Sequence, residues 1–512
     1  MKYRLLKIFL LVLVTLPGIS QDNEGFKYIR IDKEITGVQP MTGIVFWRDS
    51  YRATDAVSLE FSYMLYSDVV RDSGVYNWDV VDELLSDIAS RHHQAVLRFR
   101  YTYVGEPTSV PEYIKKSPGY EEVSGISEGK TTWFPDWSFD ELKRFTLEFY
   151  KKFASRYDND PRLAFLETGF GLWAEYHIYD GPFILGKTFP DKAFQEDFFL
   201  HLDTVFVHTP FMVSIDAASV DSNPPYTPFY DNPGLLNINF GLFDDSFMHD
   251  TFGQAGDYNT ESWNFFGRER YRYAPAGGEF SYYSDYDQRH VLDWPDGPYG
   301  HPFEFFANQF HITFMIGADQ PEYQSLQRIK QAGMSTGYKF KIVSFKSKTD
   351  SSVVTVRNVG VAPFYYDAYV TVDGVRSPVS LKLLSPGDSI VCPVTAGGDN
   401  PVLTITSDRL VQGQTIEYLG TENNLNAGEQ AIKIIVYPNP AKRNNTLYVD
   451  TSVDEKKILF FTLYDLTGRK ILTLKRCGKI AAIPLTGIRA GVYFLEISDG
   501  GDVLKVQKLI VE

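Results

Sequence analysis

The sequence predicts a (β/α)8 barrel followed by two all-β, immunoglobulin-like sandwich domains. Strand-like runs alternate with amphipathic helical runs in residues 26–335, short alternating strands without helices follow in 338–419, and a second all-β stretch occupies 432–512. A polar stretch at 420–431 is expected to link the two sandwiches. An apolar fraction of 44% is enough to supply each domain with a core.

Eight strand-like runs are expected in the barrel, and helical runs separate several of them. The helical spacing covers 77–93, 138–157 and 190–206. Eight strands joined by parallel crossovers within about 300 residues favour a closed barrel over an open sheet. The expected strands are 43–47, 56–66, 94–103, 162–170, 211–218, 235–243, 276–283 and 311–317.

Residues 1–20 are typical of a secretory signal peptide. Lys2, Arg4 and Lys7 precede a short apolar run, and Gly18 and Ser20 supply small residues before the expected cleavage point. The apolar run is too short to span a bilayer, and no later segment reaches membrane length. We therefore expect an exported protein that has no transmembrane segment once the signal is removed.

The overall charge argues against nucleic acid as a partner. The net charge is −15, and the Lys and Arg residues form no cluster that would attract a polyanion. The two cysteines, Cys392 and Cys477, fall in different predicted domains, so a structural disulfide is not expected. Aromatic residues make up 15% of the chain, and their flat faces suit core packing and stacking on sugar rings.

Two glutamates are expected at the rim of the barrel. In such barrels the functional residues follow the carboxyl ends of the strands, whereas residues within the strands fill a packed interior. The fourth strand breaks at Gly169 and Gly171, so that Glu175 follows its carboxyl end, and Glu279 lies in the seventh strand after two glycines. A carboxyl pair of this kind suits glycosidic cleavage, because one group protonates the leaving oxygen and the other attacks or stabilises the oxocarbenium-like centre.

The last segment of the chain carries specific motifs. VYPNP (436–440), LYDLTGRKI (463–471), LTGIRAGVYFLEI (485–497) and the terminal KLIVE resemble the C-terminal sorting domain of proteins exported by the type IX secretion system of Bacteroidetes. The resemblance spans 432–512. It implies that the type IX secretion machinery is a partner, and that the protein is secreted or held at the outer-membrane surface of a Gram-negative bacterium.

The strand positions of the two glutamates resemble those of clan A glycoside hydrolases. In that clan the fourth-strand Glu is the acid/base and the seventh-strand Glu is the nucleophile. The resemblance implies these roles for Glu175 and Glu279, with retention of configuration. The clan usually has Asn immediately before the acid/base Glu, whereas this chain has Ala174.

A second resemblance covers nearly the whole barrel and the first sandwich. It is to a little-characterised bacterial family that pairs a glycosidase-like barrel with an immunoglobulin-like domain, and it implies carbohydrate processing. That family more often has Trp-Gly-Glu-Trp-His, where Trp173, Glu175 and His177 match, and Ala174 and Tyr176 depart from the pattern. The segments that carry the resemblance are VLRFRYTY (96–103), FGLWAEYH (170–177), GLFDDSF (241–247), GGE (277–279), NQFHITFMIGA (308–318) and VRNVGVAPFYYDAYV (356–370).

Other side chains near the strand ends are candidates for substrate binding, each with a structural alternative. Arg98 and Arg100 could hold a sugar hydroxyl or a uronic carboxylate, or one of them could pair with a barrel acid such as Glu60 or Glu167. Glu167 lies within its strand and is expected to be a structural partner. The candidate substrate-binding residues are Trp47, Arg98, Arg100, Trp173, His177, Asp216, Asn239, Asp244, Asp245 and His311.

The alternatives for these candidates differ by residue type. Trp47 and Trp173 are stacking platforms or core residues. Asp216 and Asn239 bind sugar hydroxyls or make structural hydrogen bonds. The Asp244–Asp245 pair binds substrate, tunes a catalytic pKa or starts a turn.

No metal and no cofactor are expected. His177, His301 and His311 raise the question of a metal centre, but the chain lacks HExxH, and it also lacks P-loop, dinucleotide-binding and Ser or Cys nucleophile motifs. Two functions remain. The favoured one is a secreted glycoside hydrolase acting on a polysaccharide or oligosaccharide. The alternative is a non-catalytic, glycan-binding surface protein built on a degenerate barrel.

Overall fold

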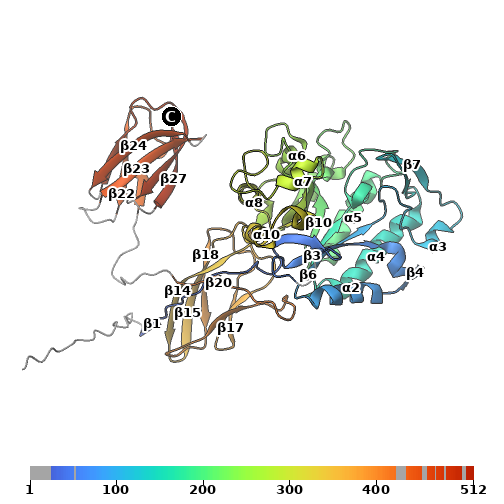
Figure 1. Ribbon diagram of the computed structural model, residues 1–512, viewed down its shortest axis with the longest axis horizontal. Helices are drawn as coiled ribbons and strands as arrows, with labels where there is room; N and C mark the ends of the chain where they lie inside the picture. Colours follow the sequence, from blue (N-terminus) through green and yellow to red (C-terminus); the bar gives the residue numbers. More distant parts are fainter. Residues whose placement is uncertain are drawn as a thin grey trace, which may run out of the picture. The chain divides into compact units, whose positions relative to one another are not determined.

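The chain forms two compact units, Met1–Glu422 and Asn423–Glu512. The computed structural model describes residues 25–50, 54–421, 434–451, 458–466, 469–477, 480–498 and 503–512 (Figure 1). The predicted signal peptide, 1–20, and positions 422–431 of the predicted linker lie outside the described residues.

Eight parallel strands of the first unit close into a barrel in chain order, which confirms the predicted (β/α)8 architecture. Each predicted strand overlaps an observed one. The strands are β2 (Gly43–Trp47), β3 (Leu59–Leu65), β6 (Gln94–Arg100), β9 (Leu163–Thr168), β10 (Phe211–Ser214), β11 (Gly241–Phe247), β12 (Ala276–Phe280) and β13 (Phe314–Ile316).

Helices connect these strands and surround the barrel (Figure 1). The longer ones are α2 (Asp79–Ala89), α4 (Asp140–Tyr157), α5 (Lys192–Val205), α6 (Tyr258–Phe266), α7 (Asp285–His290), α8 (Phe303–Phe310) and α10 (Leu326–Gly333). Single turns are α1 (Tyr66–Val69), α3 (Glu112–Lys115), α9 (Gln320–Tyr323), and the 3-10 turns η1 (Leu172–Ala174), η2 (Ile215–Ala218), η3 (Pro228–Tyr230), η4 (Pro233–Asn237) and η5 (Arg270–Arg272). Two small hairpins, β4 (Val70–Asp72) with β5 (Val75–Tyr76) and β7 (Val123–Ser127) with β8 (Lys130–Phe134), extend the loops.

Helix α4 shows why these segments are helical. Asp140 and Glu141 stand in its first turn, where they stabilise the positive end of the helix dipole. Phe145, Phe149 and Phe153 then recur every four residues, so they form one apolar stripe that packs against the outside of the barrel. Each fully buried side chain of this size contributes about 1.5–3 kcal/mol to the stability of the fold.

The interior of the barrel changes from apolar to polar along the strands. Inward-facing side chains at the lower level belong to one apolar core cluster: Val45, Phe61, Val96, Phe165, Met212 and Phe243. Two positions further along the same strands, and therefore on the same face, are Trp47, Tyr63, Arg98, Glu167, Ser214 and Asp245. Glu279 follows Gly277 on β12 in the same way. The alternation of the strands thus delivers polar groups to the carboxyl-end rim.

The first sandwich follows the barrel and belongs to the same unit. One sheet contains β1 (Lys27–Tyr28), β14 (Phe340–Lys348), β15 (Ser351–Asn358), β18 (Ser389–Val394) and β20 (Tyr418–Leu419), and the other contains β16 (Tyr369–Val372), β17 (Val375–Ser380) and β19 (Leu403–Thr406). The start of the described chain is tied to the end of this domain: the Gly420 N–H donates to the Lys33 carbonyl at 2.8 Å, and the Thr421 N–H donates to the Ile31 carbonyl at 3.0 Å.

The sandwich packs against the amino-end face of the barrel. Its core residues and the lower barrel level form one continuous apolar cluster. The Tyr366 hydroxyl donates to the carbonyl of Ala164, beside the start of the fourth strand. Arg409, which is buried, donates to the Leu163 carbonyl at 2.7 Å and to Thr209 Oγ1 at 3.2 Å. These contacts close the end of the barrel opposite the rim.

The second unit is a β-sandwich with its own core. Its sheets are β21 (Ile434–Tyr437), β22 (Thr446–Thr451) and β25 (Ile480–Pro484), and β24 (Lys470–Cys477), β23 (Ile458–Asp465), β26 (Gly491–Ser498) and β27 (Val503–Val511). Cys477 lies here and Cys392 lies in the first unit, and neither is in a disulfide. None of the helices in the described parts of the chain is long and apolar enough to cross a membrane.

Candidate active site at the barrel rim

The loop after β9 turns so tightly that it needs its glycines. The Gly171 N–H donates to the Glu175 carbonyl at 2.8 Å. A Cβ on Gly169 would lie 2.0 Å from the carbonyl oxygen of Ala174, and one on Gly171 would lie 1.9 Å from that of His177. The chain therefore folds back on the strand end and holds Glu175 at the rim, where only 7% of it is exposed.

The turn also forces two non-glycine residues into the left-handed region. Trp173 and Ala174 have φ of 57° and 58°, a conformation that costs roughly 1 kcal/mol or more per residue. Neighbouring side chains hold it in place: the Trp173 carbonyl accepts from the Tyr63 hydroxyl at 3.1 Å and from Arg98 Nη1 at 3.2 Å. Backbone strain sustained by surrounding contacts is typical of functional sites.

His177 connects two carboxylates, one through each ring nitrogen. Nε2 lies 2.7 Å from Glu175 Oε2, and Nδ1 lies 3.4 Å from Asp216 Oδ1. Burial lowers the pKa of His177, but the charges of Asp216 and Glu175 outweigh this effect and raise it to about 9. Asp216 is fixed in turn by Ser214, whose Oγ donates to Oδ2 at 2.8 Å. The imidazole lies at ion-pair distance from both acids and orients the Glu175 carboxyl.

Ligand atoms of Glu175, His177 and Asp216 lie within 4.8 Å of one another, close enough for a metal ion. The imidazole presents a different nitrogen to each acid, however, at ion-pair distance. A shared metal would be bound by a single nitrogen together with the carboxylates. We interpret the three residues as an ion-paired cluster.

Both predicted glutamates have raised pKa values. Burial is the main cause for Glu175, and the charge of Asp245 adds to it, while His177 acts in the opposite direction on this pKa. Burial also raises the pKa of the half-buried Glu279, with further contributions from Asp245, Glu167 and Glu175, and with Arg98 opposing them. The charge of Glu175 therefore contributes to the raised pKa of Glu279.

Gly278 explains how Glu279 reaches this position. Strands β11 and β12 are paired with an irregularity between Asp244 and Phe247. Gly278 has φ of 148°, and a Cβ there would lie 2.0 Å from the carbonyl oxygen of Asp244. Only glycine allows the two backbones to approach so closely.

Arg98 forms ion pairs with other residues of the barrel. Its guanidinium is 1% exposed, and Nη2 lies 2.6 Å from Glu167 Oε2 and 3.0 Å from Asp245 Oδ1. The sequence left open whether Arg98 binds a sugar or pairs with a barrel acid such as Glu60 or Glu167. In the structure Arg98 pairs with Glu167. Glu60 pairs instead with Arg91 and His93. Arg98 thus neutralises charge below the two catalytic candidates and contacts Trp173 rather than open solvent.

Aromatic rings surround the acids. Tyr63 contacts Trp47 and Tyr103 with ring centroids 5.7 and 5.5 Å apart, and Tyr103 meets Trp173 edge-on at 4.5 Å. The Trp173 indole N–H donates to the Tyr179 hydroxyl at 2.8 Å. Among the described residues no acceptor reaches the buried indole N–H of Trp47. The rim therefore combines carboxyl groups with aromatic faces.

Three of the predicted binding residues do not face the mouth of the barrel, and their predictions need correction. Strand β11 begins at Gly241, because η4 occupies part of the range expected for it, so Asn239 precedes the strand at the opposite end. His311 ends α8 and precedes β13, stacks on Tyr271 and contacts the Val361 carbonyl of the sandwich at 2.6 Å.

Asp244 is the third predicted binding residue that does not face the mouth of the barrel. It is fully buried, and its oxygens accept from Asn259 Nδ2 at 2.7 Å and Trp263 Nε1 at 2.8 Å. Burial raises its pKa to about 7. Since it is fully buried and held by these donors, Asp244 lies behind the rim, whereas the adjacent Asp245 pairs with Arg98 in the barrel interior.

Several rim residues were not found from the sequence. Tyr63 lies two positions after Phe61 on the inward face of β3, so the strand alternation was a usable signal. Tyr103 and Tyr282 lie in loops, where no periodicity applies. Burial and the charges of Glu279 and Asp319 raise the pKa of Tyr282, which places its hydroxyl beside the seventh-strand acid.

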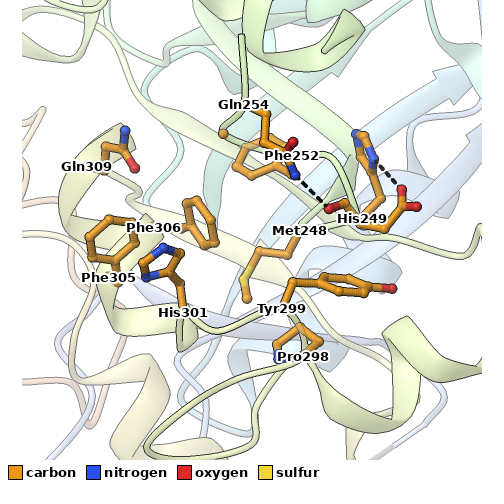
Figure 2. Close-up of a pocket in the computed structure, with 12 residues that line it drawn as sticks. Met248, His249, Phe252, Gln254, Pro298, Tyr299, His301, Phe305, Phe306 and Gln309 are labelled. Carbon is orange, nitrogen blue, oxygen red and sulfur yellow. Dashed lines mark hydrogen bonds and ion pairs between the residues drawn. The ribbon is translucent and has the colours of Figure 1, made fainter. Parts of the chain in front are cut away.

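A separate hollow of about 240 Å³ lies between the loop that follows β11, the loop that joins α7 to α8, and helix α8 (Figure 2). Met248, His301 and Phe306 line it, and His301 stacks on Phe305 at 4.2 Å. Neither Glu175 nor Glu279 lines this hollow.

Comparison with known proteins identifies the end of the chain. Residues 435–512 match the family described as the secretion system C-terminal sorting domain, which confirms the prediction from the motifs. A search of curated proteins finds no match to the chain.

Solved structures similar to the chain include three glycosidases. One is a family 39 glycoside hydrolase from Bacteroides cellulosilyticus, with 10% identity, a TM-score of 0.35, and coverage of 72% of this chain and 84% of that one. A family 36 α-galactosidase from Geobacillus stearothermophilus has 10% identity, a TM-score of 0.31 and coverage of 70% and 56%. A β-galactosidase from Halorubrum lacusprofundi has 10% identity, a TM-score of 0.33 and coverage of 54% and 52%.

The chain spans about half the length of the two galactosidases that it matches. Similarity at this level adds nothing to the argument about activity, which rests on the residues at the rim. The sorting domain shows that the protein is exported through the type IX secretion system to the cell surface or the outside.

Proposed function

We propose that the barrel is a glycoside hydrolase in which Glu175 is the general acid/base and Glu279 the nucleophile. The observation that supports the proposal is that Glu175 follows the carboxyl end of the fourth strand, Glu279 lies in the seventh, and the charge of one acts on the pKa of the other. Barrel chemistry occurs at this rim, and a carboxyl pair is what glycosidic cleavage requires.

The proposed reaction has two steps. In the first, the Glu279 carboxylate attacks the anomeric carbon while Glu175 donates its proton to the glycosidic oxygen, so that the leaving group departs as an alcohol and a glycosyl ester forms. In the second, the Glu175 carboxylate takes a proton from a water molecule that attacks the anomeric carbon. The sugar is released, Glu279 returns as a carboxylate and Glu175 is protonated again.

The electrostatics support this division of roles. A raised pKa keeps Glu175 protonated near neutral pH, as a general acid requires. Burial and the charge of Asp245 raise the pKa of Glu279, and Arg98 opposes them; a neutral Glu175 removes a smaller contribution in the same direction as Asp245. His177 and Asp216 orient the acid, which makes them positioning residues in this proposal.

The surrounding rings would form the sugar subsites. Trp47 and Trp173 are proposed stacking platforms, with Tyr63 and Tyr103 between them. The substrate is a polysaccharide or an oligosaccharide.

The first experiment separates turnover from binding. Wild type, Glu175→Gln, Glu279→Gln and a control, Glu83→Gln on the exposed side of α2, are incubated with a panel of polysaccharides and assayed for released reducing ends. We expect both rim variants to lose at least about 10³-fold in rate, consistent with loss of a general acid or a nucleophile, and the control to match wild type. A wild type that binds a polysaccharide and never releases reducing ends would favour the non-catalytic glycan-binding alternative.

A second experiment assigns the two roles. Azide is added to Glu279→Gly and Glu175→Gly with an aryl glycoside of the sugar found in the screen. Azide replacing the nucleophile attacks the substrate directly and gives a glycosyl azide of inverted configuration. Azide acting in the Glu175 variant attacks the glycosyl ester and gives the retained configuration. The opposite pairing of products would exchange the roles.

A further inference from the structure

Three side chains of β6 point into the barrel at successive levels. Val96, Arg98 and Arg100 are alternate residues of one strand and share a face. Val96 belongs to the apolar lower level, and Arg98 lies among the charged groups above it. Arg100 is the last residue of the strand, so its side chain belongs to the level of the rim.

The two arginines have different surroundings. Arg98 has two carboxylate partners, Glu167 and Asp245. Arg100 forms no ion pair and donates no hydrogen bond to any residue that the structure describes. Its guanidinium lies over the Tyr103 ring, 4.0 Å from the centroid. The side chain is partly buried, and burial lowers the pKa of Arg100. The charges of Glu106 and Asp68 act on Arg100 in the opposite direction, but neither acid is within ion-pair distance of it. A partly desolvated charge without an ion-pair partner is unfavourable unless another molecule supplies one.

Tyr103 places this cation next to the proposed catalytic pair. Its ring lies between Arg100 on one side and Trp173, at 4.5 Å, on another. The negative charge of Glu279 is among the groups that raise the pKa of Tyr103, after burial. The Tyr103 ring thus contacts Arg100 and Trp173, and the charge of Glu279 acts on its hydroxyl.

The remaining charges at the rim restrict where an anion can bind. Glu175, Glu279, Asp216 and Asp245 repel a negative group, and the cations nearest to them are already paired. Arg100 is the position at which a carboxylate or a sulfate would meet a guanidinium in a partly dry setting, where such a pair is strongest. A neutral glycan would leave this charge without a partner.

We propose that the substrate is an anionic glycan, and that Arg100 binds a carboxylate or sulfate on the sugar adjacent to the one that is cleaved. This proposal rests on the proposed function, because it assumes that one sugar of the glycan is cleaved. Binding of the anionic glycan can nevertheless be measured without turnover. The guanidinium forms paired N–H···O bonds with the anion, and the Tyr103 ring supports it from behind.

Affinity electrophoresis of the full chain tests the proposal. Native gels contain polygalacturonate or alginate as carboxylate probes, carrageenan as a sulfate probe, or galactomannan as a neutral probe. We expect retardation of wild type in a carboxylate or sulfate gel, a loss of about tenfold or more in affinity for Arg100→Met, and partial retention for Arg100→Lys. The type of gel that retards the protein distinguishes the two anions.

Two controls separate binding from folding and from net charge. Arg144→Met removes the same charge from the exposed face of α4 and is expected to migrate as wild type does. The thermal unfolding midpoint of Arg100→Met should stay close to that of wild type, since the substitution removes the contact with the Tyr103 ring and no ion pair with a described residue. Equal retardation of wild type and Arg100→Met, retardation by galactomannan alone, or no retardation in any anionic gel would overturn the proposal. A chain that binds in this way and cleaves nothing would leave it standing while refuting the hydrolase.

Discussion

Arg98 donates two hydrogen bonds to Asp245, from Nη2 to Oδ1 at 3.0 Å and from Nη1 to Oδ2 at 3.2 Å. The pair joins the third strand of the barrel to the sixth across its interior. A second acid, Glu167, shares the same guanidinium. One buried cation therefore compensates two carboxylates beneath the rim.

Replacing Arg98 by Met should destabilise the first unit by about 3–5 kcal/mol, because Glu167 and Asp245 would lose their counter-charge in the barrel interior. Denaturant unfolding of the purified protein measures the change. The double variant Arg98→Met with Glu167→Gln should recover part of the loss. A destabilisation below about 1 kcal/mol would mean that the charges are solvated or protonated in the native protein.

Asp245→Asn should shift the pH profile of activity toward acid. The Asp245 charge raises the pKa of Glu175 and of Glu279, so neutralising it lowers both. The alkaline limb, where the general acid loses its proton, and the acid limb, where the nucleophile gains one, then both move to lower pH. The dependence of kcat/KM on pH measures the shift. Asp250→Asn, an exposed acid after the same strand, should leave the profile in place.

Gly278→Ala should prevent or strongly weaken folding of the barrel. The added Cβ would meet the Asp244 carbonyl oxygen at 2.0 Å, and the backbone has φ of 148°. Gly74→Ala is the matched control, since Gly74 has φ of 68° and open space around it. We expect Gly74→Ala to lower the free energy of unfolding by about 1 kcal/mol, from backbone strain alone. We expect Gly278→Ala to lower it by more than about 3 kcal/mol. Equal unfolding free energies would show that β11 and β12 can separate at little cost.

Dialysis against EDTA should leave turnover unchanged, because His177 presents a different nitrogen to each of its acids. The reducing-end assay before and after chelation checks this. Loss of turnover that Zn²⁺ or Mn²⁺ restores, with the metal retained by wild type and not by His177→Ala, would make the three residues a metal centre.

The barrel could be predicted because its signals are local. Each strand shows buried runs or alternation, and the strand count placed Glu175 and Glu279 on strands four and seven. The errors at Asn239 and His311 arose at strand starts. Segments before a strand are as apolar as the strand itself, and only backbone geometry, such as the left-handed His311 that ends α8, marks the boundary.

The partnerships at the rim could not be predicted in the same way. The pairing of Arg98 with Asp245 depends on how strands that are not adjacent in the barrel face each other across its interior, which no sequence period encodes. The contact of His177 with Asp216 depends on an irregular loop with two left-handed residues. The resemblance of 170–177 to a known motif indicated the residues, and the fold supplied their geometry.

The clamp of Gly420 and Thr421 on Lys33 and Ile31 determines how the first unit responds to mechanical load. A pull on the chain beyond Thr421 first meets hydrogen bonds to the amino-terminal segment and then the sandwich sheet, and it does not act directly on any strand of the barrel. If the sorting domain holds the protein at a cell surface while the rim grips a polymer, the barrel and the sandwich carry the tension in series. The hydrogen bonds of Gly420 and Thr421 would then be loaded first at the carboxyl-terminal end of the first unit.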